Sequence, residues 1–594
     1  MTNPQAAQRL DPRIVLACWA FVAVFFVVRA VNGLATTPLV LDTDDAMRLT
    51  NVHDLLAGQG WYDQVQHRLN APYGAEIHWS RLVDLPEAVL VALLRIFGGL
   101  ADTIAAFVWP LGLLLVLLIV NGRLALRLGG SGAVLPALIL PAFSLVTMAE
   151  FAPGRFDHHG PQIIAGLVML GAAIGALERP RFAILAGIAA ALSLGIGIEG
   201  LPMIGATILA FGLNWVLRPG QAATLRGFGI SLALASLLAL TLGVAPSRWL
   251  VPAYDEVSIA YVSGMVLCGM ALVALSLLTR ANRVMRLIAG IAAAAIVVGI
   301  VLALWPALLK GPYGGLDPWL ITNWIDKISE AQPWAVSLAA SPAYPLAVMI
   351  PVLVALAVAG WTLVRRRTNS RDAWLLYALF LIVGLAAMLL QIRAARMAVP
   401  LAVPGAAVLI ARAREVYLSK RTIVPILGLV GSWCISAGVL VALAANLLIP
   451  APASSARAGE GDSLKAIHSC LAPSAFANLA ELPPERIMTP IDLGSHMLLF
   501  TPHAVVAAPY HRNQQGVRDA FRFFNEAIEV ARQIVDARGI GLVVICPAMA
   551  EVHGVVPYAP DSFVALREAN ALPPWLVRKS LSGEPLEIYS VLPR

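Results

Sequence analysis

The sequence contains few charged residues for its length. Only 13% of its 594 residues are charged, whereas 59% are hydrophobic. Soluble globular domains carry about 25% charged residues, so this composition excludes a water-soluble protein for most of the chain. Apolar runs of about 20 residues, the length that a helix needs to cross a membrane, recur from residue 13 to residue 449. The sequence therefore predicts a polytopic α-helical membrane protein.

Cysteine is also scarce, and none of the five cysteines has the CxxC spacing of zinc or dithiol sites. Cys18, Cys268 and Cys434 lie in or beside apolar runs. Cys470 and Cys546 lie in the more polar tail, where they either form a disulfide or remain free thiols if the compartment is oxidising. The sequence predicts no zinc or redox site and leaves the pairing of the tail cysteines open.

The sequence lacks a signal-peptide cleavage site after its first apolar run, so we expect that run to remain as an anchor. The net charge of +7 does not indicate a nucleic-acid partner, because the basic residues form short clusters between apolar runs, where the positive-inside rule expects them. The predicted spans number thirteen: residues 13–34, 101–121, 133–149, 161–177, 182–198, 201–217, 227–244, 258–278, 286–305, 343–364, 372–391, 396–413 and 423–449.

The basic clusters all fall on the side of the N-terminus, which the rule makes cytoplasmic. These clusters are Arg123 and Arg127; Arg179 and Arg181; Arg218 and Arg226; Arg280, Arg283 and Arg286; Arg365, Arg366, Arg367 and Arg371; and Arg412, Arg414, Lys420 and Arg421. Arginine-rich inner loops favour a bacterial inner membrane whose outer face meets the periplasm.

The opposite face carries three loops and the tail, which are residues 35–100, 150–160, 306–342 and 450–594. All ten histidines fall in these segments. An odd number of spans places the tail on the outer face together with the three loops. We therefore divide the chain into a transmembrane domain, residues 1–449, and a periplasmic domain that follows it.

The tail is predicted to be a separate α/β domain. Residues 450–463, rich in Ala, Ser, Pro and Gly, form the predicted linker. Residues 517–537 have the 3.6-residue apolar period of an amphipathic helix. The predicted strands are residues 486–492, 504–509, 541–547 and 586–592.

Three carboxylates follow the first predicted span within a few residues: Asp42, Asp44 and Asp45. One interpretation is a solvated loop that caps a helix, since Asp before an apolar helical pattern caps helices well. The other is a cation site, because clustered carboxylate oxygens suit Mg²⁺ or Mn²⁺. Taken alone, the pattern favours the cap.

Two further outer loops contain candidate functional groups. In GRFDHHG, residues 154–160, Asp157 and His159 project the same way from an extended segment, as two metal ligands would. Asp157 would equally serve as a helix cap, and the motif alone does not separate these interpretations. In DKISEAQPW, residues 326–334, Glu330 is a weak signal by itself.

Together, these three loops resemble those of the catalytic subunit of oligosaccharyltransferase, most closely its archaeal single-subunit form. This family consists of membrane glycosyltransferases with the GT-C fold, thirteen spans and a C-terminal domain on the outer face. Its first outer loop carries an Asp, a helix and an LAxxGxY run; here Asp45 stands twelve residues before Ala57 of LLAGQGWY. The loop continues with Pro72, Gly74 and the run IHWSRLVD, which contains His78.

The other loops match further motifs of the family. GRFDHHG corresponds to the Asp-His-His motif of archaeal members, and KISEAQP places Glu330 at the position of the family's glutamate. QIRAARMAVP resembles the segment that carries the family's arginine for the lipid-linked diphosphate. Arg393 stands at that position, with Arg396 as a near alternative.

The resemblance implies a role for each matched residue. Asp45, Asp157 and His159 would bind a divalent metal, Mg²⁺ or Mn²⁺. Asp45 would also contact the acceptor and form the catalytic pair with Glu330. The arginines that would bind the donor phosphate are Arg393 and Arg396, and the additional candidates in the same loops are Asp44, His158 and His78.

One motif of the family is largely missing. The family's tail has a Trp-Trp-Asp-Tyr-Gly signature that reads the hydroxyl residue of the Asn-x-Ser/Thr acceptor. The corresponding run here, MTPIDLGSHMLL, keeps only Asp492 and Gly494, which are therefore the acceptor-binding candidates. The acceptor's identity stays open between protein asparagine, protein Ser or Thr, a polysaccharide and a lipid.

The resemblance implies an enzyme that moves a glycan from a polyprenyl-diphosphate donor to an acceptor on the outer face of the bilayer. A second hypothesis is a GT-C transferase that uses a polyprenyl-phosphate monosaccharide to modify a cell-envelope polysaccharide or lipid. A third is a transporter or flippase, which would need ionisable residues near the middle of its spans, and the sequence has very few there.

Overall fold

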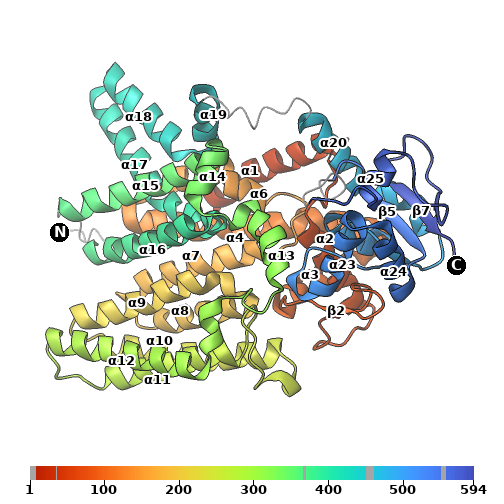
Figure 1. The fold of residues 1–594 in the computed structure, drawn as a ribbon. Helices are drawn as coiled ribbons and strands as arrows, with labels where there is room; N and C mark the ends of the chain where they lie inside the picture. The colour runs from red at the N-terminus through yellow and green to blue at the C-terminus, as the bar shows by residue number, and fades with distance from the viewer. Residues whose placement is uncertain (1–8, 35–36, 366–369, 450–459, 550–556, 594) are drawn as a thin grey trace.

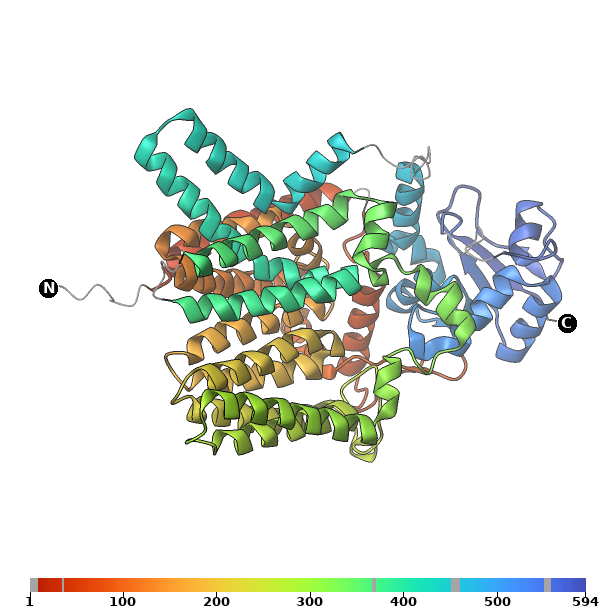
Figure 2. The same ribbon diagram turned by 60° about the vertical axis from the view of Figure 1, so that its left-hand side comes forward.

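The computed structural model describes residues 9–34, 37–365, 370–449, 460–549 and 557–593. A bundle of long helices occupies one side of the molecule, and a smaller α/β part lies at one end of the bundle (Figures 1 and 2). Arg366 and Arg367 of one predicted basic cluster fall outside the described residues, as does the part of the predicted linker at 450–459. The rest of that linker is helical, because α20 (Glu460–Leu471) begins at its end.

The chain is a multi-pass membrane protein. Within the described residues, ten helical segments are long and apolar enough to cross a membrane, or eleven if one bent pair counts as a single span. The unbent spanning helices are α1 (Pro12–Gly33), α4 (Ala101–Gly129), α7 (His159–Ala176), α9 (Leu201–Leu217), α10 (Ala222–Gly243), α11 (Ile259–Ser276), α12 (Arg283–Leu304), α15 (Ala343–Val364), α16 (Arg371–Leu390) and α17 (Ala395–Lys420).

Three of the thirteen predicted spans are helical but irregular, so the count of thirteen stays a prediction. The run 133–149 is broken into α5 (Val134–Ile139) and α6 (Leu145–Glu150), with Pro141 in the short 3₁₀ turn between them. Proline cannot donate the backbone hydrogen bond that a continuous helix needs. The helix α8 (Phe182–Ile196) is only 15 residues long, and α18 (Ile423–Ser436) meets α19 (Gly438–Leu448) at 91°.

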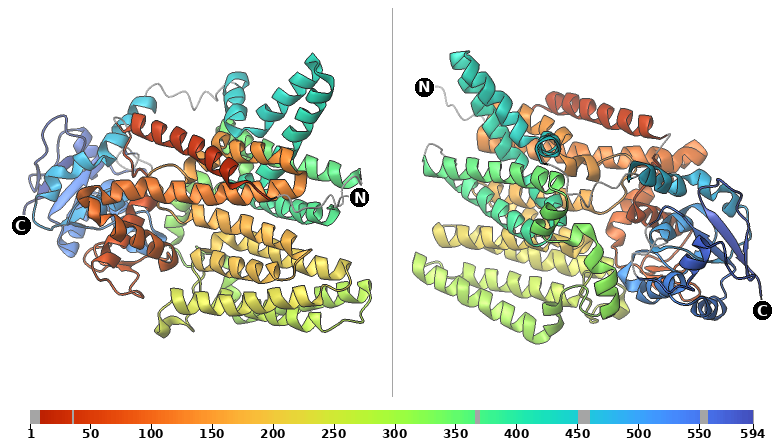
Figure 3. Two further views of the ribbon diagram at one scale, coloured as in Figure 1. Left: turned by 180° about the vertical axis from the view of Figure 1, so that it is seen from behind. Right: turned by 45° about the horizontal axis from the view of Figure 1, so that its top comes forward.

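The bundle has a buried centre and a lipid-facing edge. Helix α17 runs through the centre, where its residues from Ala395 to Ala411 are mostly buried. Helix α12 lies at the edge, and Arg286 is its one buried residue. Helix α1 also lies at the outside of the bundle, along α4 (Figure 3).

The segment between α1 and α4 lies beside the α/β part (Figure 1). It contains α2 (Thr43–Leu56), the hairpin of β1 (Val65–Gln66) and β2 (Ala75–Glu76), and α3 (Arg81–Leu94). The third outer segment contributes α13 (Pro318–Asn323) and α14 (Trp334–Ala340). These outer elements and the α/β part surround the polar region described below.

The α/β part contains a five-stranded sheet of order β4-β3-β5-β7-β6. Strand β3 is parallel to β4 and β5, while β7 is antiparallel to β5 and β6. The strands are β3 (Arg486–Met488), β4 (Ala504–Val505), β5 (Leu542–Ile545), β6 (Leu576–Arg578) and β7 (Glu587–Val591). The helices around them are α20, α22 (Ile491–Phe500), α23 (Gln514–Asn525), α24 (Ile528–Arg538) and α25 (Phe563–Glu568).

Three local predictions for the tail need correction. The strand predicted over 486–492 ends at Met488, and the helix α22 follows Pro490, so Asp492 and Gly494 are helical. The helix predicted over 517–537 is two helices, α23 and α24, because the chain is extended between them at Glu526. The strand predicted over 504–509 is limited to β4, Ala504–Val505, and strand β6 was not predicted at all.

The α/β part is held together and docked onto the outer loops by specific contacts. Cys470 and Cys546 form a disulfide. Helix α22 packs against α2, and a Cβ at Gly494 would collide with the carbonyl oxygen of Ala507, which explains the need for glycine there. The hydroxyl group of Tyr510 donates a hydrogen bond to the carbonyl oxygen of Thr43, at 3.0 Å.

A second docking contact joins the α/β part to the loop before α11. Arg512 forms a two-pronged ion pair with Asp255, at 2.7 and 2.8 Å, and His511 lies 2.7 Å from the same carboxylate. Burial alone would raise the pKa of Asp255, but hydrogen bonds from Arg512 and His511 hold that pKa well below its usual range.

Candidate active site

A cavity of about 180 Å³ lies where the outer loops meet the outer ends of α7 and α17. It brings together side chains from segments that are far apart in the sequence. The polar groups that line it include Asp44, His78, His158, His159, Glu199, Glu330, Arg393 and Arg396. The predicted first loop, second loop, glutamate loop and arginine segment therefore meet in one place.

The centre of this region is the segment that enters α7. Asp157 accepts a hydrogen bond from the backbone N–H of His158 at 2.6 Å, and its two oxygens also contact the imidazoles of His158 and His159. All three side chains are buried, and one ligand-type atom of each lies within 4.8 Å of the others. Burial would raise the pKa of Asp157, but the positive charges of His158 and His159 hold it well below its usual value.

This trio has the chemistry of a metal site. One carboxylate and two imidazoles form a mixed oxygen and nitrogen donor set, which suits Mn²⁺ or Zn²⁺ better than Mg²⁺. The three groups are close enough to face one ion, and they are held by the start of a spanning helix. The residues present therefore fit a divalent cation.

Arg396 connects the trio to the predicted glutamate. Its guanidinium lies 2.7 Å from Nε2 of His159, 2.6 Å from a carboxylate oxygen of Glu330 and 2.9 Å from Glu150. Arg396 is thus fully engaged by protein groups. The arrangement fixes Glu330, whose side chain is 45% exposed, at the edge of the cavity.

Arg393 is held more loosely. Its guanidinium lies 3.8 Å from Glu199, and its Nε donates to the side chain of Gln391 at 3.0 Å. Glu199 also lies 3.1 Å from His159, so it joins the arginine to the histidine trio. Because its ion pair is longer than those of Arg396, Arg393 can reach an anionic ligand with less rearrangement.

The three aspartates at the start of α2 have different surroundings. Asp42 caps the helix by accepting from the backbone N–H of Asp44 at 2.9 Å, as the cap interpretation predicts. Asp45 is 1% exposed and accepts from the backbone N–H groups of Phe156 and Asp157, at 2.7 and 2.9 Å. Only Asp44 lines the 180 Å³ cavity.

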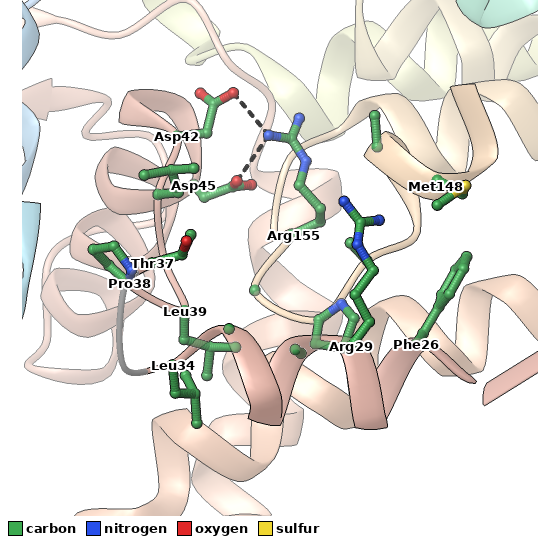
Figure 4. Close-up of a pocket in the computed structure, with 17 residues that line it drawn as sticks. Phe26, Arg29, Leu34, Thr37, Pro38, Leu39, Asp42, Asp45, Met148 and Arg155 are labelled. Carbon is green, nitrogen blue, oxygen red and sulfur yellow. Dashed lines mark hydrogen bonds and ion pairs between the residues drawn. The ribbon is translucent and has the colours of Figure 1, made fainter. Parts of the chain in front are cut away.

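The side chain of Asp45 instead faces Arg155 (Figure 4). Arg155 donates to Asp42 at 2.8 Å and to Asp45 at 2.9 Å, and it lies 3.3 Å from Asp157. The structure thus brings Asp157, His158 and His159 together and leaves Asp45 linked to them through backbone amides and Arg155. Its predicted role as a metal ligand stays a prediction.

No protein-family model and no curated protein matches this chain. Solved structures do match it. The archaeal oligosaccharyltransferase AglB from Archaeoglobus fulgidus, in complex with an inhibitory peptide and a dolichol-phosphate, superposes with a TM-score of 0.65 at 14% identity, over 97% of this chain and 74% of that chain. An A. fulgidus oligosaccharyltransferase in complex with Zn and sulfate gives 0.62 at 14% identity, over 97% and 73%.

The arabinofuranosyltransferase AftD from Mycobacteria gives a TM-score of 0.50 at 15% identity, over 99% of this chain and 42% of that chain. These proteins are membrane glycosyltransferases. This chain has the GT-C fold. The fold predicted from the three loop motifs is therefore confirmed.

Within this GT-C fold, the other predicted site residues lie at different distances from the trio. His78 lines the same cavity and contacts His511 with tilted rings, whose centroids lie 4.5 Å apart. Burial, with the nearby charge of His511, lowers the pKa of His78 well below its usual value, so this imidazole is neutral. Asp492 and Gly494 lie on α22, do not line the cavity, and stay acceptor candidates by prediction alone.

The sequence motifs missed three charged residues of this GT-C site. Arg155 stands two residues before Asp157, inside the motif that was singled out. Glu150 and Glu199 stand at the outer ends of apolar runs, where a carboxylate is a signal of function in a membrane protein. Both now pair with the arginines and histidines of the site.

Proposed function

We propose that this protein is an oligosaccharyltransferase-like enzyme that moves a glycan from a polyprenyl-diphosphate donor to an acceptor at the outer membrane surface. The observation that supports this best is the single cavity that joins His159, Glu330 and Arg393 at the outer end of the bundle. A polyprenyl tail lies in the bilayer, so its phosphate and sugar reach this level. The fold is that of AglB, whose solved complex contains a dolichol-phosphate and a peptide.

Arg393 and Arg396 have different roles toward the donor in this proposal. Arg393, with its loose ion pair to Glu199, binds the phosphate oxygens by charge-assisted hydrogen bonds. Arg396 is engaged by His159 and Glu330, so it mainly positions those two groups. Both guanidiniums add positive charge where the leaving phosphate develops negative charge.

A divalent cation fits Asp157 and His159 together with His158, and Asp44 lines the same cavity as a further candidate ligand. Bound there, the ion would supply Lewis-acid stabilisation of the leaving phosphate. The donor set favours Mn²⁺ over Mg²⁺. Glu330, at the cavity edge, orients and polarises the attacking group of the acceptor. Asp45 holds the Asp157 segment in place by accepting from two of its backbone amides and, as the second carboxylate of the proposed catalytic pair, faces the acceptor.

The protein is proposed to sit in a bacterial inner membrane, with a cytoplasmic N-terminus and a periplasmic tail. The basic clusters of the inner loops support this orientation. The disulfide between Cys470 and Cys546 fits an oxidising compartment such as the periplasm. Labelling of single introduced cysteines in intact cells by a membrane-impermeant thiol reagent tests the orientation.

The decisive experiment measures transfer from undecaprenyl diphosphate that carries a radiolabelled saccharide, using purified protein in detergent with Mn²⁺ or with a chelator. We expect metal-dependent transfer that falls at least 100-fold in Glu330→Gln and Asp157→Asn. Asp326→Asn is the matched control, because Asp326 is an exposed carboxylate of the same loop that does not line the cavity. Transfer that survives both substitutions and the chelator would disprove the proposed site.

A further inference from the structure

A second, larger pocket of about 510 Å³ is lined by Asp45, which does not line the first cavity (Figure 4). It is separated from the first cavity by the Asp157 segment. Asp157 forms the connection, because its carboxylate contacts Arg155, which lines the larger pocket, and His159, which lines the smaller one. A ligand in the larger pocket therefore approaches the reaction centre from the side opposite Arg393.

One end of the larger pocket is apolar and lies beside the end of a membrane-spanning helix. Phe26 and Ala30 of the last turns of α1 line it together with Leu34, which follows the helix, opposite Met148 and Ala149 at the outer end of the broken span. Helix α1 lies at the outside of the bundle, and the side chain of Leu34 is 49% exposed although it borders the pocket. The hydrocarbon chain of a lipid can therefore reach this end of the pocket at the level of the outer leaflet.

The other end of the pocket is polar. Asp42, Asp45 and Arg155 form a connected set of ion pairs there (Figure 4). Arg29 stands between the two ends, and its guanidinium points toward the same space as that of Arg155. An arginine near a helix end usually extends into the head-group layer. Among the described residues Arg29 has no ion-pair partner, so its charge is available to an anion.

We propose that the acceptor is a membrane amphiphile with an anionic head group and a free hydroxyl, and that it binds in this pocket. Its hydrocarbon lies against α1, its phosphate or carboxylate pairs with Arg29, and its hydroxyl reaches Asp45. The chemistry of the pocket favours such a lipid over a peptide, because the wall is apolar and the basic group stands between the hydrocarbon end and the carboxylates. The proposal rests on the glycosyl transfer proposed above.

In the transfer step, the acceptor hydroxyl oxygen forms a bond to the anomeric carbon, and the bond from that carbon to the phosphate oxygen breaks. The phosphate leaves with the electron pair, and the hydroxyl proton passes to the carboxylate of Asp45. Neither of the tail residues Asp492 and Gly494 lines this pocket. Gly494 is instead required for the close packing of α22 against Ala507.

The first test measures lipid binding without catalysis. The protein is reconstituted in phosphatidylcholine nanodiscs that contain phosphatidylglycerol with a photoreactive acyl chain, and crosslinked peptides are mapped by mass spectrometry. Labelling of residues 26–39 and 148–155 should fall at least fivefold in Arg29→Gln, and also in Ala30→Trp, which fills the pocket. Arg95→Gln is the control, because Arg95 is an exposed arginine of another outer element. Equal labelling in all variants would overturn the proposal.

The second test identifies the product class. The labelled donor is supplied with either a total lipid extract of the source organism or an Asn-x-Thr peptide. A new labelled lipid, reduced at least tenfold by Arg29→Gln, supports the proposal. Label in the peptide and in no lipid overturns the lipid acceptor but leaves the glycosyltransferase intact. Arg29-dependent lipid labelling without transfer to either acceptor would instead contradict the proposed function.

Discussion

Replacement of Arg155 by methionine tests how the site is held together. The guanidinium of Arg155 lies 2.9 Å from Asp45 and 3.3 Å from Asp157, and these carboxylates are only 1% and 3% exposed. Methionine keeps much of the side chain's volume but removes its charge. Removal of one partner from a buried ion pair costs about 3–5 kcal/mol of stability. The contact with Asp42, which is 44% exposed, adds at most about 1 kcal/mol.

The loss should depend on pH in a defined direction. Burial already raises the pKa of Asp45 well above its usual value, and Arg155 counteracts that rise, so without Arg155 the carboxylate takes up a proton still more readily in the folded protein. The deficit relative to wild type is then largest at pH 7.5 and shrinks as the pH falls. Apparent melting temperatures in detergent at pH 7.5 and pH 5.5 measure it, with Arg155→Lys expected between wild type and Arg155→Met.

Arg95→Met serves as the control, since Arg95 is exposed and outside this network. If Arg155→Met has the same melting temperature as the wild type at pH 7.5, then Arg155 does not stabilise the buried carboxylates. The same conclusion follows if the melting-temperature difference from the wild type grows as the pH is lowered.

Arg393→Ala should raise the donor KM at least tenfold with little change in kcat, whereas Arg396→Ala should lower kcat. Steady-state kinetics separate them, and unchanged transfer after loss of both would favour a polyprenyl-monophosphate donor. Asp255→Asn should lower the melting temperature equally at pH 7 and pH 5. The pKa of Asp255 is depressed in the folded protein, so the ionised carboxylate keeps its full contribution to stability until the pH falls below about 4. A melting-temperature difference from wild type that is already lost at pH 5 would contradict this prediction. Loss of the Cys470–Cys546 disulfide should cost about 4.5 kcal/mol, since it closes a loop of 76 residues. In limited proteolysis, the tail of the variant with both cysteines replaced by serine should be cleaved faster than the wild-type tail. An unchanged cleavage rate would contradict a stabilising role of the disulfide.

The sequence predicted the membrane class, the outer loops and the motif at Asp157, because each depends on neighbouring residues. It could not predict which aspartate of α2 faces the cavity. Adjacent residues on a helix point about 100° apart, so the choice between Asp44 and Asp45 is made by how α2 packs. The sequence could not predict the ion-pair partners of Arg396 either, since Glu150 and Glu330 come from separate segments.

The tail shows the same limit on a smaller scale. The run over 486–492 is apolar enough for a strand, and β3 does begin there. Its continuation as α22 is fixed by Pro490 and by packing against α2, a contact between segments more than 400 residues apart. Short apolar runs fit a strand and a buried helix equally well, and only the tertiary partner decides between them.

The packing of α22 on α2 makes the two halves of the chain interdependent. The helix that presents Asp44 and Asp45 packs against α22 of the tail, and Tyr510 fixes the backbone at its first residue, Thr43. The cavity beside Asp44 thus has walls from both the membrane bundle and the α/β part. A bundle expressed without the tail would insert into the membrane but leave its aspartates unsupported, and a grafted tail would succeed only if it reproduced this helix pair.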